Sequence, residues 1–244
     1  MKLKHWALWI GLAWLVAGVP ARAQAVRAVT ETTPYTFVAD GKVVGTATEV
    51  VELTLQRARL TPYTVHLYPW ARAYDMALQE PNVLIFLIAR TAAREEQFHW
   101  AGEIMKIQYH LFRLRGRAQG VSDLASARSR TIGVMRDDVR HQYLRAKGFE
   151  KLVVSAHPID NFRKLLSGQV DMVPLTADDA TMLCRETGFD CAGLERVLTL
   201  DEASTGLYMA YSRQTPMDVV ERTRQAFDRL RAEGVVRRTM ARTP

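Results

Sequence analysis

The 244-residue chain has a net charge of +7 at pH 7. Three of these positive charges lie in a predicted leader, on Lys2, Lys4 and Arg22, which leaves +4 for the rest of the chain. The arginines near the C-terminus alternate with acidic residues, as on solvated helix faces, and this pattern argues against a nucleic-acid-binding protein. The remaining length of about 220 residues is enough for one large domain or two lobes.

The N-terminus has the pattern of a secretory signal peptide. Lys2 and Lys4 precede an apolar run over 6–19, and Ala21-Arg22-Ala23 is a small-x-small cleavage site. The run is shorter than the roughly 20 apolar residues that a membrane helix needs. We therefore expect a signal peptide over 1–23, with cleavage after Ala25 as the alternative, and an exported, soluble mature chain.

Strands and helices alternate over the next part of the chain: a strand over 26–29, a hairpin over 35–44, a helix with capping-box spacing from 46, a strand over 64–68 and a helix over 70–80. Pro69 suits the first turn of the second helix. Trp70 then lies at a strand-to-helix corner, where a tryptophan serves either in core packing or as the wall of a cleft.

An unbroken apolar run over 83–89 is typical of a strand that is covered on both faces of a parallel sheet. Arg90, Thr91 and Arg94 follow it directly, and Trp100 comes soon after. Because ligands of open α/β sheets sit beyond the carboxyl ends of the strands, Arg94 is a candidate anion clamp. The alternative is an ion pair between Arg94 and a nearby glutamate on a solvated helix face.

A further strand is predicted over 104–114, and it runs into a polar, glycine-containing segment around Gly116. A second series follows, with strands over 131–135, 152–154 and 170–174, extended segments over 197–200 and 207–212, and helices between and after them. Alternating strands and helices imply sheets flanked by helices. The break near Gly116 predicts two α/β lobes, one formed by 24–113 and 207–244 and the other by 114–206.

The chain has two cysteines, Cys184 and Cys191. In an exported protein they favour a disulfide over a metal site, since no histidine or further cysteine lies nearby. On one continuous helix their Cα atoms would be about 10 Å apart, too far to bridge, but Gly188 can end the helix and fold the chain back. Two buried, unpaired cysteines are the alternative.

Polar and aromatic residues from both halves of the chain lie just beyond predicted strand ends: Glu31, Tyr35, Trp70, Arg94, Arg136, Asp137, Asp138 and Thr176. Such corners, contributed by two lobes, predict a small-molecule cleft between the lobes. The sequence has no nucleophile elbow, phosphate loop or metal-ligand spacing. We therefore expect a ligand site with no metal, no cofactor and no catalytic residues.

Several segments resemble, in order and spacing, the type 3 family of bacterial extracellular solute-binding proteins, the periplasmic binding proteins for polar amino acids. The matching segments are PYTFVADGKVVGTATEVVELTLQ at 34–56, PWARA at 69–73, RTAARE at 90–95 continuing to WAG at 100–102, IGV at 132–134 and LLSGQVD at 165–171. The resemblance covers nearly all of the chain after the leader. Each motif is loose, and the specificity comes from their order.

The resemblance implies an α/β, two-lobed periplasmic binding protein type II fold, in which each lobe is a central sheet flanked by helices and the ligand cleft lies between the lobes. It implies that Arg94 grips a ligand carboxylate, that Trp70 packs on the ligand, and that the loop over 136–139 closes from the second lobe. Thr91 and Trp100, which belong to the matched arginine segment, complete the predicted ligand contacts.

The chain departs from the family pattern at three positions. Ala89 stands where a serine is usual, Thr176 where an aspartate for the ligand amine is usual, and Thr32 where an aromatic residue stacks on the ligand. These changes leave the fold prediction intact and put an ordinary amino acid in doubt as the ligand. Glu31 is then the first choice for an amine, if the ligand has one.

The sequence therefore predicts a periplasmic, monomeric solute-binding protein that captures a small carboxylate-bearing ligand, an amino acid or a related acid, and delivers it to an ABC permease of the inner membrane. Two alternatives remain open. One is a dehydratase-like periplasmic enzyme of the same fold, which the lack of an obvious acid–base pair disfavours. The other is a free-standing ligand sensor.

Overall fold

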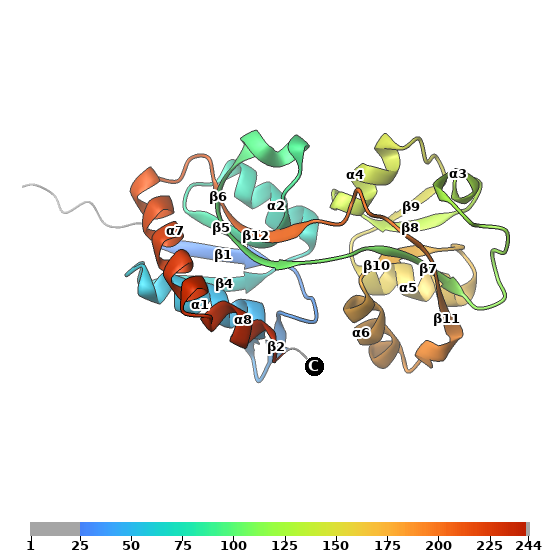
Figure 1. Cartoon of the computed structure of the whole chain (residues 1–244), viewed down its shortest axis with the longest axis horizontal. Coiled ribbons are helices and arrows are strands. Elements are labelled where there is room, and N and C mark those ends of the chain that lie inside the picture. The colour runs from blue at the N-terminus through green and yellow to red at the C-terminus, as the bar shows by residue number, and fades with distance from the viewer. Residues whose placement is uncertain (1–24, 243–244) are drawn as a thin grey trace, which may run out of the picture.

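The structure, a computed structural model, describes residues 25–242. The signal peptide predicted over 1–23 lies outside these residues. Figure 1 shows two lobes side by side along the long axis, joined by extended segments. Each lobe contains β-sheet flanked by helices, which confirms the predicted fold class. Among the described residues no helix combines the length and the apolar character needed to span a bilayer.

The first lobe is built on a five-stranded sheet in the order β4-β1-β5-β12-β6. Its strands are β1 (Val26–Thr30), β4 (Tyr63–Leu67), β5 (Val83–Ala89), β6 (Phe98–Lys106) and β12 (Gly206–Ser212). β1 pairs in parallel with β4 and β5, whereas β12 runs antiparallel to β5 and β6. The sheet is therefore mixed, and the carboxyl ends of β1, β4 and β5 lie at one edge.

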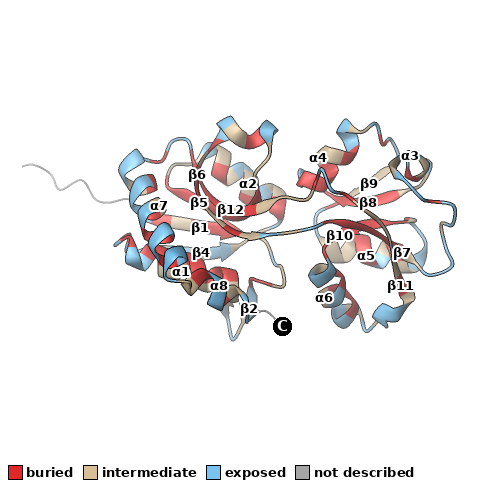
Figure 2. Cartoon of the chain, viewed as in Figure 1, coloured by how far each residue is buried: buried red, intermediate tan, exposed pale blue. Residues whose placement is uncertain are grey.

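Helices cover both faces of this sheet. They are α1 (Thr46–Arg57), α2 (Trp70–Gln79), α7 (Met217–Ala232) and α8 (Val235–Met240), with the hairpin β2 (Phe37–Ala39) and β3 (Lys42–Val44) and the short helix η1 (Ala92–Gln97). All seven residues of β5 are buried, as its apolar run predicts, and Figure 2 shows burial along the strands with exposed residues on the outward helix faces. α2 packs on the sheet through Trp70, Ala73 and Ala77, which recur at helical spacing.

The loop that carries Tyr35 is fixed by a glycine. Gly45 is the N-cap of α1 and has a φ of 122°, a region that favours glycine. A Cβ there would lie 2.3 Å from the carbonyl oxygen of Tyr35, so only glycine permits this approach. The capping box predicted from the spacing at Thr46 would make Thr46 the N-cap, but α1 begins at Thr46 and its N-cap is Gly45, which has no side chain to cap the helix. The Thr48 and Thr36 hydroxyls hydrogen-bond each other at 2.8 Å.

The second lobe contains two smaller sheets, β10-β7-β11 and β8-β9. Its elements are β7 (His110–Leu114), α3 (Leu124–Ala127), β8 (Ile132–Met135), α4 (Val139–Ala146), β9 (Leu152–Ser155), α5 (Pro158–Ser167), β10 (Val173–Leu175), α6 (Ala177–Thr187), η2 (Cys191–Gly193) and β11 (Leu194–Thr199). A parallel bridge between Ile132 and Met172 joins the two sheets. The N-termini of α4, α5 and α6 each follow a strand end.

The strand predicted over 104–114 is in fact two strands in different lobes. β6 ends at Lys106 in the first sheet, and β7 begins at His110 in the second. The segment over 107–109 crosses beside the returning chain, since Ile107 N–H donates to the Thr205 carbonyl and Leu200 N–H donates to the Tyr109 carbonyl. The crossing thus precedes Gly116. The sequence did not predict this position, because the apolar alternation continues through the crossing and gives no sign of a break.

The predicted disulfide is confirmed. α6 ends at Gly188, which adopts the left-handed conformation with a φ of 68°. The chain then turns back, and Cys184 is bonded to Cys191 with a Cα–Cα distance of 5.6 Å. The disulfide joins the last turn of α6 to η2, on the outer side of the second lobe.

Candidate ligand-binding site

A narrow cavity lies between the two lobes, and we call it the inner cavity. Its volume is about 50 Å³. The first lobe contributes Glu31, Tyr35, Trp70, Ala89, Arg94 and Leu207, among others, and the second contributes Asp138, Val139, Arg140, Pro158, Thr176 and Asp179. Because a water takes roughly 30 Å³ of liquid, this space holds only one or two waters, and the lobes are close to full contact.

Arg94 is the most deeply buried cation on the first-lobe side. It lies in η1 directly after β5, and it is 1% exposed. Nη1 donates to the Ala89 carbonyl at 3.2 Å and Nη2 to the Asp137 carbonyl at 3.0 Å, while Nε is buried without a partner. The guanidinium lies 4.9 Å from the ring centre of Tyr74 and 5.7 Å from that of Trp70.

No carboxylate within residues 25–242 forms an ion pair with Arg94. The glutamate pairing considered from the sequence is made by its neighbour Arg90, whose Nη2 lies 2.5 Å from a carboxylate oxygen of Glu95. Arg94 therefore keeps a buried positive charge without a direct ion-pair partner in the described part of the chain, and its charge acts on Asp138 only as a minor cause of the lowered pKa of that carboxyl. Isolated buried charges are costly unless a partner compensates them.

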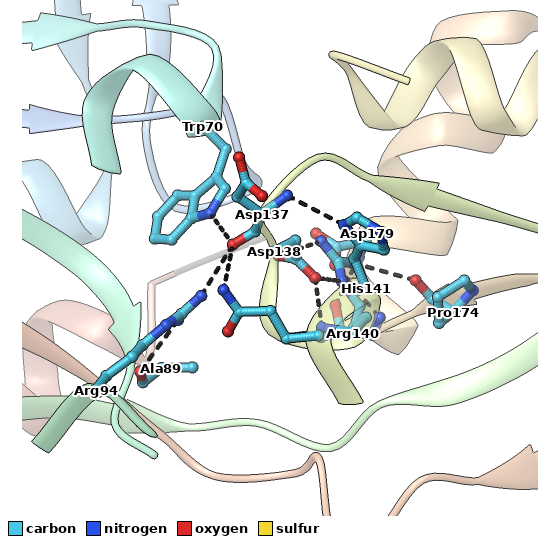
Figure 3. A network of polar contacts seen from close by, with 11 residues as sticks. Trp70, Ala89, Arg94, Asp137, Asp138, Arg140, His141, Pro174 and Asp179 are labelled. Carbon is cyan, nitrogen blue, oxygen red and sulfur yellow. Dashed lines mark hydrogen bonds and ion pairs between the residues drawn. The ribbon is translucent and has the colours of Figure 1, made fainter. Parts of the chain in front are cut away.

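The second lobe reaches Arg94 through a backbone carbonyl (Figure 3). The Asp137 carbonyl oxygen accepts hydrogen bonds from Trp70 Nε1 at 3.1 Å, from Arg94 Nη2 at 3.0 Å and from Gln142 Nε2 at 3.3 Å. Asp137 has a φ of 57°, an uncommon conformation for a residue other than glycine, while its side chain is exposed. The loop between β8 and α4 thus contacts the first lobe through its backbone.

The second-lobe wall carries a cluster of three charged side chains, in which Arg140 pairs with Asp138 and, at a longer distance, with Asp179. Arg140 Nε lies 2.5 Å and Nη2 3.0 Å from the two carboxylate oxygens of Asp138, and Nη1 lies 3.9 Å from Asp179 and donates to the Pro174 carbonyl at 3.2 Å. Burial tends to raise the pKa of Asp138, but Arg140 holds it below its ordinary value. Burial keeps the pKa of Asp179 above its ordinary value despite the same arginine.

Glu31 is the carboxylate in the inner cavity that has no ion-pair partner among the described residues, although the positive charge of Arg140 acts on it. It forms no hydrogen bond or ion pair with any other residue of the described chain. Burial, reinforced by the nearby negative charge of Asp138, raises its pKa from 4.5 to about 8. In this closed arrangement Glu31 is therefore largely protonated at neutral pH.

This pKa shift predicts a pH-dependent stability. The raised folded pKa of Glu31 gives a contribution that is fully present below pH 4.5 and is lost as the pH rises towards 8. Glu31→Gln should therefore melt at a higher temperature than the wild type at pH 8 and at the same temperature at pH 4.5. Thermal unfolding across this range measures the effect, with Glu96→Gln at an exposed position as the control. A difference between variant and wild type that is independent of pH would contradict the assignment.

A second contact between the lobes lies at the rim of the inner cavity. The Tyr35 hydroxyl donates to the Asp178 carboxylate at 2.5 Å. Tyr35 follows β1 in the first lobe, and Asp178 is in the first turn of α6 in the second. Together with the Asp137 carbonyl, this bond holds the lobes on two sides of the cavity.

The structure brings six of the ten predicted contacts to the inner cavity: Glu31, Tyr35, Trp70, Arg94, Asp138 and Thr176. The Thr176 hydroxyl is already engaged, since it accepts from Asp179 N–H at 3.0 Å in a capping box at the start of α6. Trp70 is 4% exposed and both packs in the core and lines the cavity, so the two interpretations of this residue hold together.

Four predicted contacts lie off the inner cavity. Thr91 is the N-cap of η1, and its buried hydroxyl has no partner. Trp100, on β6, donates to the Glu95 carbonyl and packs edge-on against Phe98 and Tyr208, beside a different surface hollow. Arg136 is exposed, and Asp137 contributes its carbonyl rather than its side chain.

Three residues that the sequence did not single out also line the cavity: Tyr109, Arg140 and Asp179. The ring centre of Tyr109 lies 4.9 Å from the Arg140 guanidinium. The only sequence signal for Asp179 was its capping-box spacing after Thr176, and Arg140 had none. In the described part of the chain no group of three or more histidine, cysteine, aspartate or glutamate side chains is placed to hold a metal ion.

No protein-family model matches the chain, and no curated protein matches it in sequence. Solved structures do match. A histidine kinase sensor domain with similarity to periplasmic binding proteins has a TM-score of 0.76 at 19% identity, covering 90% of this chain and 96% of that one. An ancestral arginine-binding protein bound to arginine has a TM-score of 0.76 at 15% identity, covering 90% and 97%. The fold is that of the two-lobed periplasmic binding proteins.

A third match is the arginine-, lysine-, histidine-binding protein ArtJ from the thermophilic bacterium Geobacillus stearothermophilus, with a TM-score of 0.77 at 15% identity, covering 90% of this chain and 95% of that one. Identities this low carry the fold and not the ligand. The neighbours are amino-acid-binding proteins and a sensor domain, which is in line with the resemblance seen in the sequence. Membership of the type 3 family stays a prediction.

Proposed function

We propose that this protein is a periplasmic solute-binding protein that captures a small carboxylate-bearing ligand, an amino acid or a related acid, between its two lobes. The observation that carries the proposal is the buried guanidinium of Arg94, which has no carboxylate partner in the described chain and an Nε without any partner. A guanidinium makes two parallel hydrogen bonds to a carboxylate, and such bonds are stronger than those to a neutral oxygen.

In this proposal the ligand carboxylate takes the place that the Asp137 carbonyl now holds on Arg94. The exchange is favourable because a carboxylate brings the negative charge that a carbonyl lacks, while Trp70 remains free to pack against the ligand. A ligand amine would face Glu31, since Asp138 is committed to Arg140 and the Thr176 hydroxyl to its helix cap.

The remaining parts of the proposal concern the cell. Two further structural matches are substrate-binding proteins of amino acid ABC transporters, which supports delivery of the ligand to an ABC permease. We further propose that the protein acts as a monomer in the periplasm after removal of the signal peptide over 1–23. The first lobe is proposed to span 24–106 and 206–244, with the crossings at 107–109 and 200–205, which shifts the limits of 113 and 207 expected from the sequence.

Ligand sensing is the second candidate function, because one structural neighbour is the sensor domain of a histidine kinase. The other neighbours are binding proteins rather than enzymes, which supports binding without turnover. Uptake of the identified ligand separates the two functions. A transport protein is required for uptake by the cell, whereas loss of a sensor changes gene expression and leaves uptake intact.

The direct experiment is a thermal-shift screen of the purified protein against amino acids, dicarboxylates and aromatic acids. A ligand that binds the native state raises the melting temperature by mass action. We expect at least one small carboxylate to do so. If no carboxylate raises the melting temperature and a neutral or cationic compound does, the proposed function is overturned.

Ligand binding should also draw the lobes together. The contacts that hold them here are few, chiefly the Asp137 carbonyl with Arg94 and Trp70, and Tyr35 with Asp178, so the ligand-free protein can open about its two crossings. A ligand that contacts both lobes shifts this equilibrium towards the closed form. Small-angle scattering should show a smaller radius of gyration at saturating ligand, whereas identical curves with and without ligand would contradict hinge closure.

A further inference from the structure

A larger hollow adjoins the inner cavity, and we call it the outer chamber. Its volume is about 330 Å³, against about 50 Å³ for the inner cavity. The two spaces share three wall residues, Glu31, Thr32 and Pro158. The outer chamber therefore begins where the inner cavity ends, and it is open to solvent on its far side.

Both lobes form the walls of the outer chamber. The first lobe contributes the corner between β4 and α2, with Leu67, Tyr68 and Pro69. The second contributes the start of α5 and one face of α6, with Ile159, Met182 and Leu183. The chamber is thus completed only when the lobes lie together, as the inner cavity is.

The chemistry of the two spaces differs. The inner cavity is lined by charged groups that include Arg94, Arg140 and Asp138, whereas the walls of the outer chamber are mostly apolar side chains. Among the described residues no arginine or lysine lines the chamber, and its carboxylates are Glu31 and Glu186. Apart from the imidazole of His157, the N-cap of α5, a second anionic group of a ligand would find no cationic side chain of the described chain there.

The volumes decide how a ligand can divide between the two spaces. The inner cavity holds about two waters, enough for a carboxylate head, while the outer chamber has room for roughly ten. Each methylene that such an apolar space removes from water strengthens binding by about fourfold, the equivalent of roughly 0.8 kcal/mol. A ligand that consists of a carboxylate head without a tail would leave the apolar walls of the outer chamber in contact with solvent.

We propose that the outer chamber holds an apolar tail of the ligand, so that the ligand is a carboxylate with a tail of about four carbons or more, or an aromatic ring, rather than a short acid or a dicarboxylate. This inference rests on the proposed function, since it takes the carboxylate head to lie at Arg94. The raised pKa of Glu31, about 8, is consistent with this inference, because a protonated Glu31 places no charge at the boundary between the inner cavity and the apolar outer chamber.

Calorimetric titration of the full protein at pH 7 with two matched series tests the inference. One series is alanine, norleucine and glutamate, and the other, without an amine, is propanoate, hexanoate and glutarate. In the series that binds, the long apolar member should bind at least tenfold more tightly than the short one. The dicarboxylate should bind more weakly than the long apolar member.

Met182→Trp, which fills the outer chamber, should reduce the ratio of long to short affinity to below twofold. Thr181→Trp is the matched control, since Thr181 is exposed on the same helix and does not line the chamber, and it should keep the wild-type ratio. Glu186→Arg places a cation at the exposed wall, so it should tighten binding of glutamate or glutarate, and it serves as the test if Met182→Trp fails to fold.

Two outcomes overturn the inference alone: equal affinity for the long and short members, or tighter binding of the dicarboxylate than of the apolar acid by the wild type. In both of these cases carboxylates still bind, so the proposed function stands. If no member of either series binds and the thermal-shift screen finds only neutral or cationic compounds, the proposed function fails and the inference fails with it.

Discussion

Arg94→Ala is expected to weaken binding of the ligand by a factor of tens to thousands. The Arg94 guanidinium is buried beside the inner cavity, and its loop follows the fully buried strand β5, so it is held in place before the ligand arrives. Removing one partner of a buried, hydrogen-bonded charge pair typically costs about 2–5 kcal/mol. Titration of variant and wild type with the ligand found by thermal shift measures the loss.

The controls for this variant separate the fork of the guanidinium from its charge. Arg94→Lys should recover only part of the affinity, since an ammonium cannot make two parallel bonds to a carboxylate. Arg90→Ala, four residues away and paired with Glu95, should bind as the wild type does. If Arg94→Ala binds the ligand as tightly as the wild type, the ligand does not sit at Arg94.

Glu31→Gln then reports whether the ligand has an amine. The substitution removes a carboxylate that forms no hydrogen bond or ion pair with any other residue of the described chain. An ammonium facing Glu31 would lose its charge partner, so the affinity would fall, even though the same variant is expected to be more stable without ligand at pH 8. If Arg94 matters and Glu31 does not, the ligand is a carboxylate without an amine.

The parts of the site that the sequence predicts are those where a strong local pattern ends at a corner. The end of the apolar run of β5 predicts where the segment that carries Arg94 begins, and Pro69 predicts the strand-to-helix corner at Trp70. Both residues line the inner cavity, as expected from the rule that sites lie at strand ends. Trp100 follows the same loop, but it lines a separate surface hollow that is neither the inner cavity nor the outer chamber. The register of β6 with β12 sets the side of the sheet on which Trp100 lies.

The ion pair on the second-lobe wall was not predictable from spacing. Residues two apart on a helix do not face each other, so Asp138 and Arg140 carry no pairing signal. They meet because Asp138 is the N-cap of α4, outside the helical turn, and its side chain folds back over Arg140. The strand prediction over 104–114 failed for a related reason, since apolar alternation continues while the chain changes sheets.

Arg140→Met should be the most destabilising single change in the second lobe. It leaves Asp138 buried without its ion-pair partner, next to Asp179. Breaking a buried pair by removing one partner typically costs about 3–5 kcal/mol, since the remaining charge is uncompensated. Urea unfolding measures the loss. Arg145→Met, exposed on the same helix, is the control and should change the free energy of unfolding by less than about 0.5 kcal/mol.

The pH dependence of this loss identifies its cause. Burial raises the pKa of Asp138, and Arg140, with a smaller contribution from Arg94, holds it below its ordinary value. Without Arg140 we expect burial to dominate and to raise this pKa. A carboxyl with a raised folded pKa stabilises the protein below its unfolded pKa of about 3.9 and loses that contribution as the pH rises. The deficit of Arg140→Met should therefore be small near pH 4 and grow towards pH 7. Asp138→Asn in the same chain should recover much of it at pH 7, because no buried charge then remains at that position. An equal deficit at both pH values, without recovery by Asp138→Asn, would mean that Arg140 stabilises the lobe by packing on Tyr109 rather than by its charge.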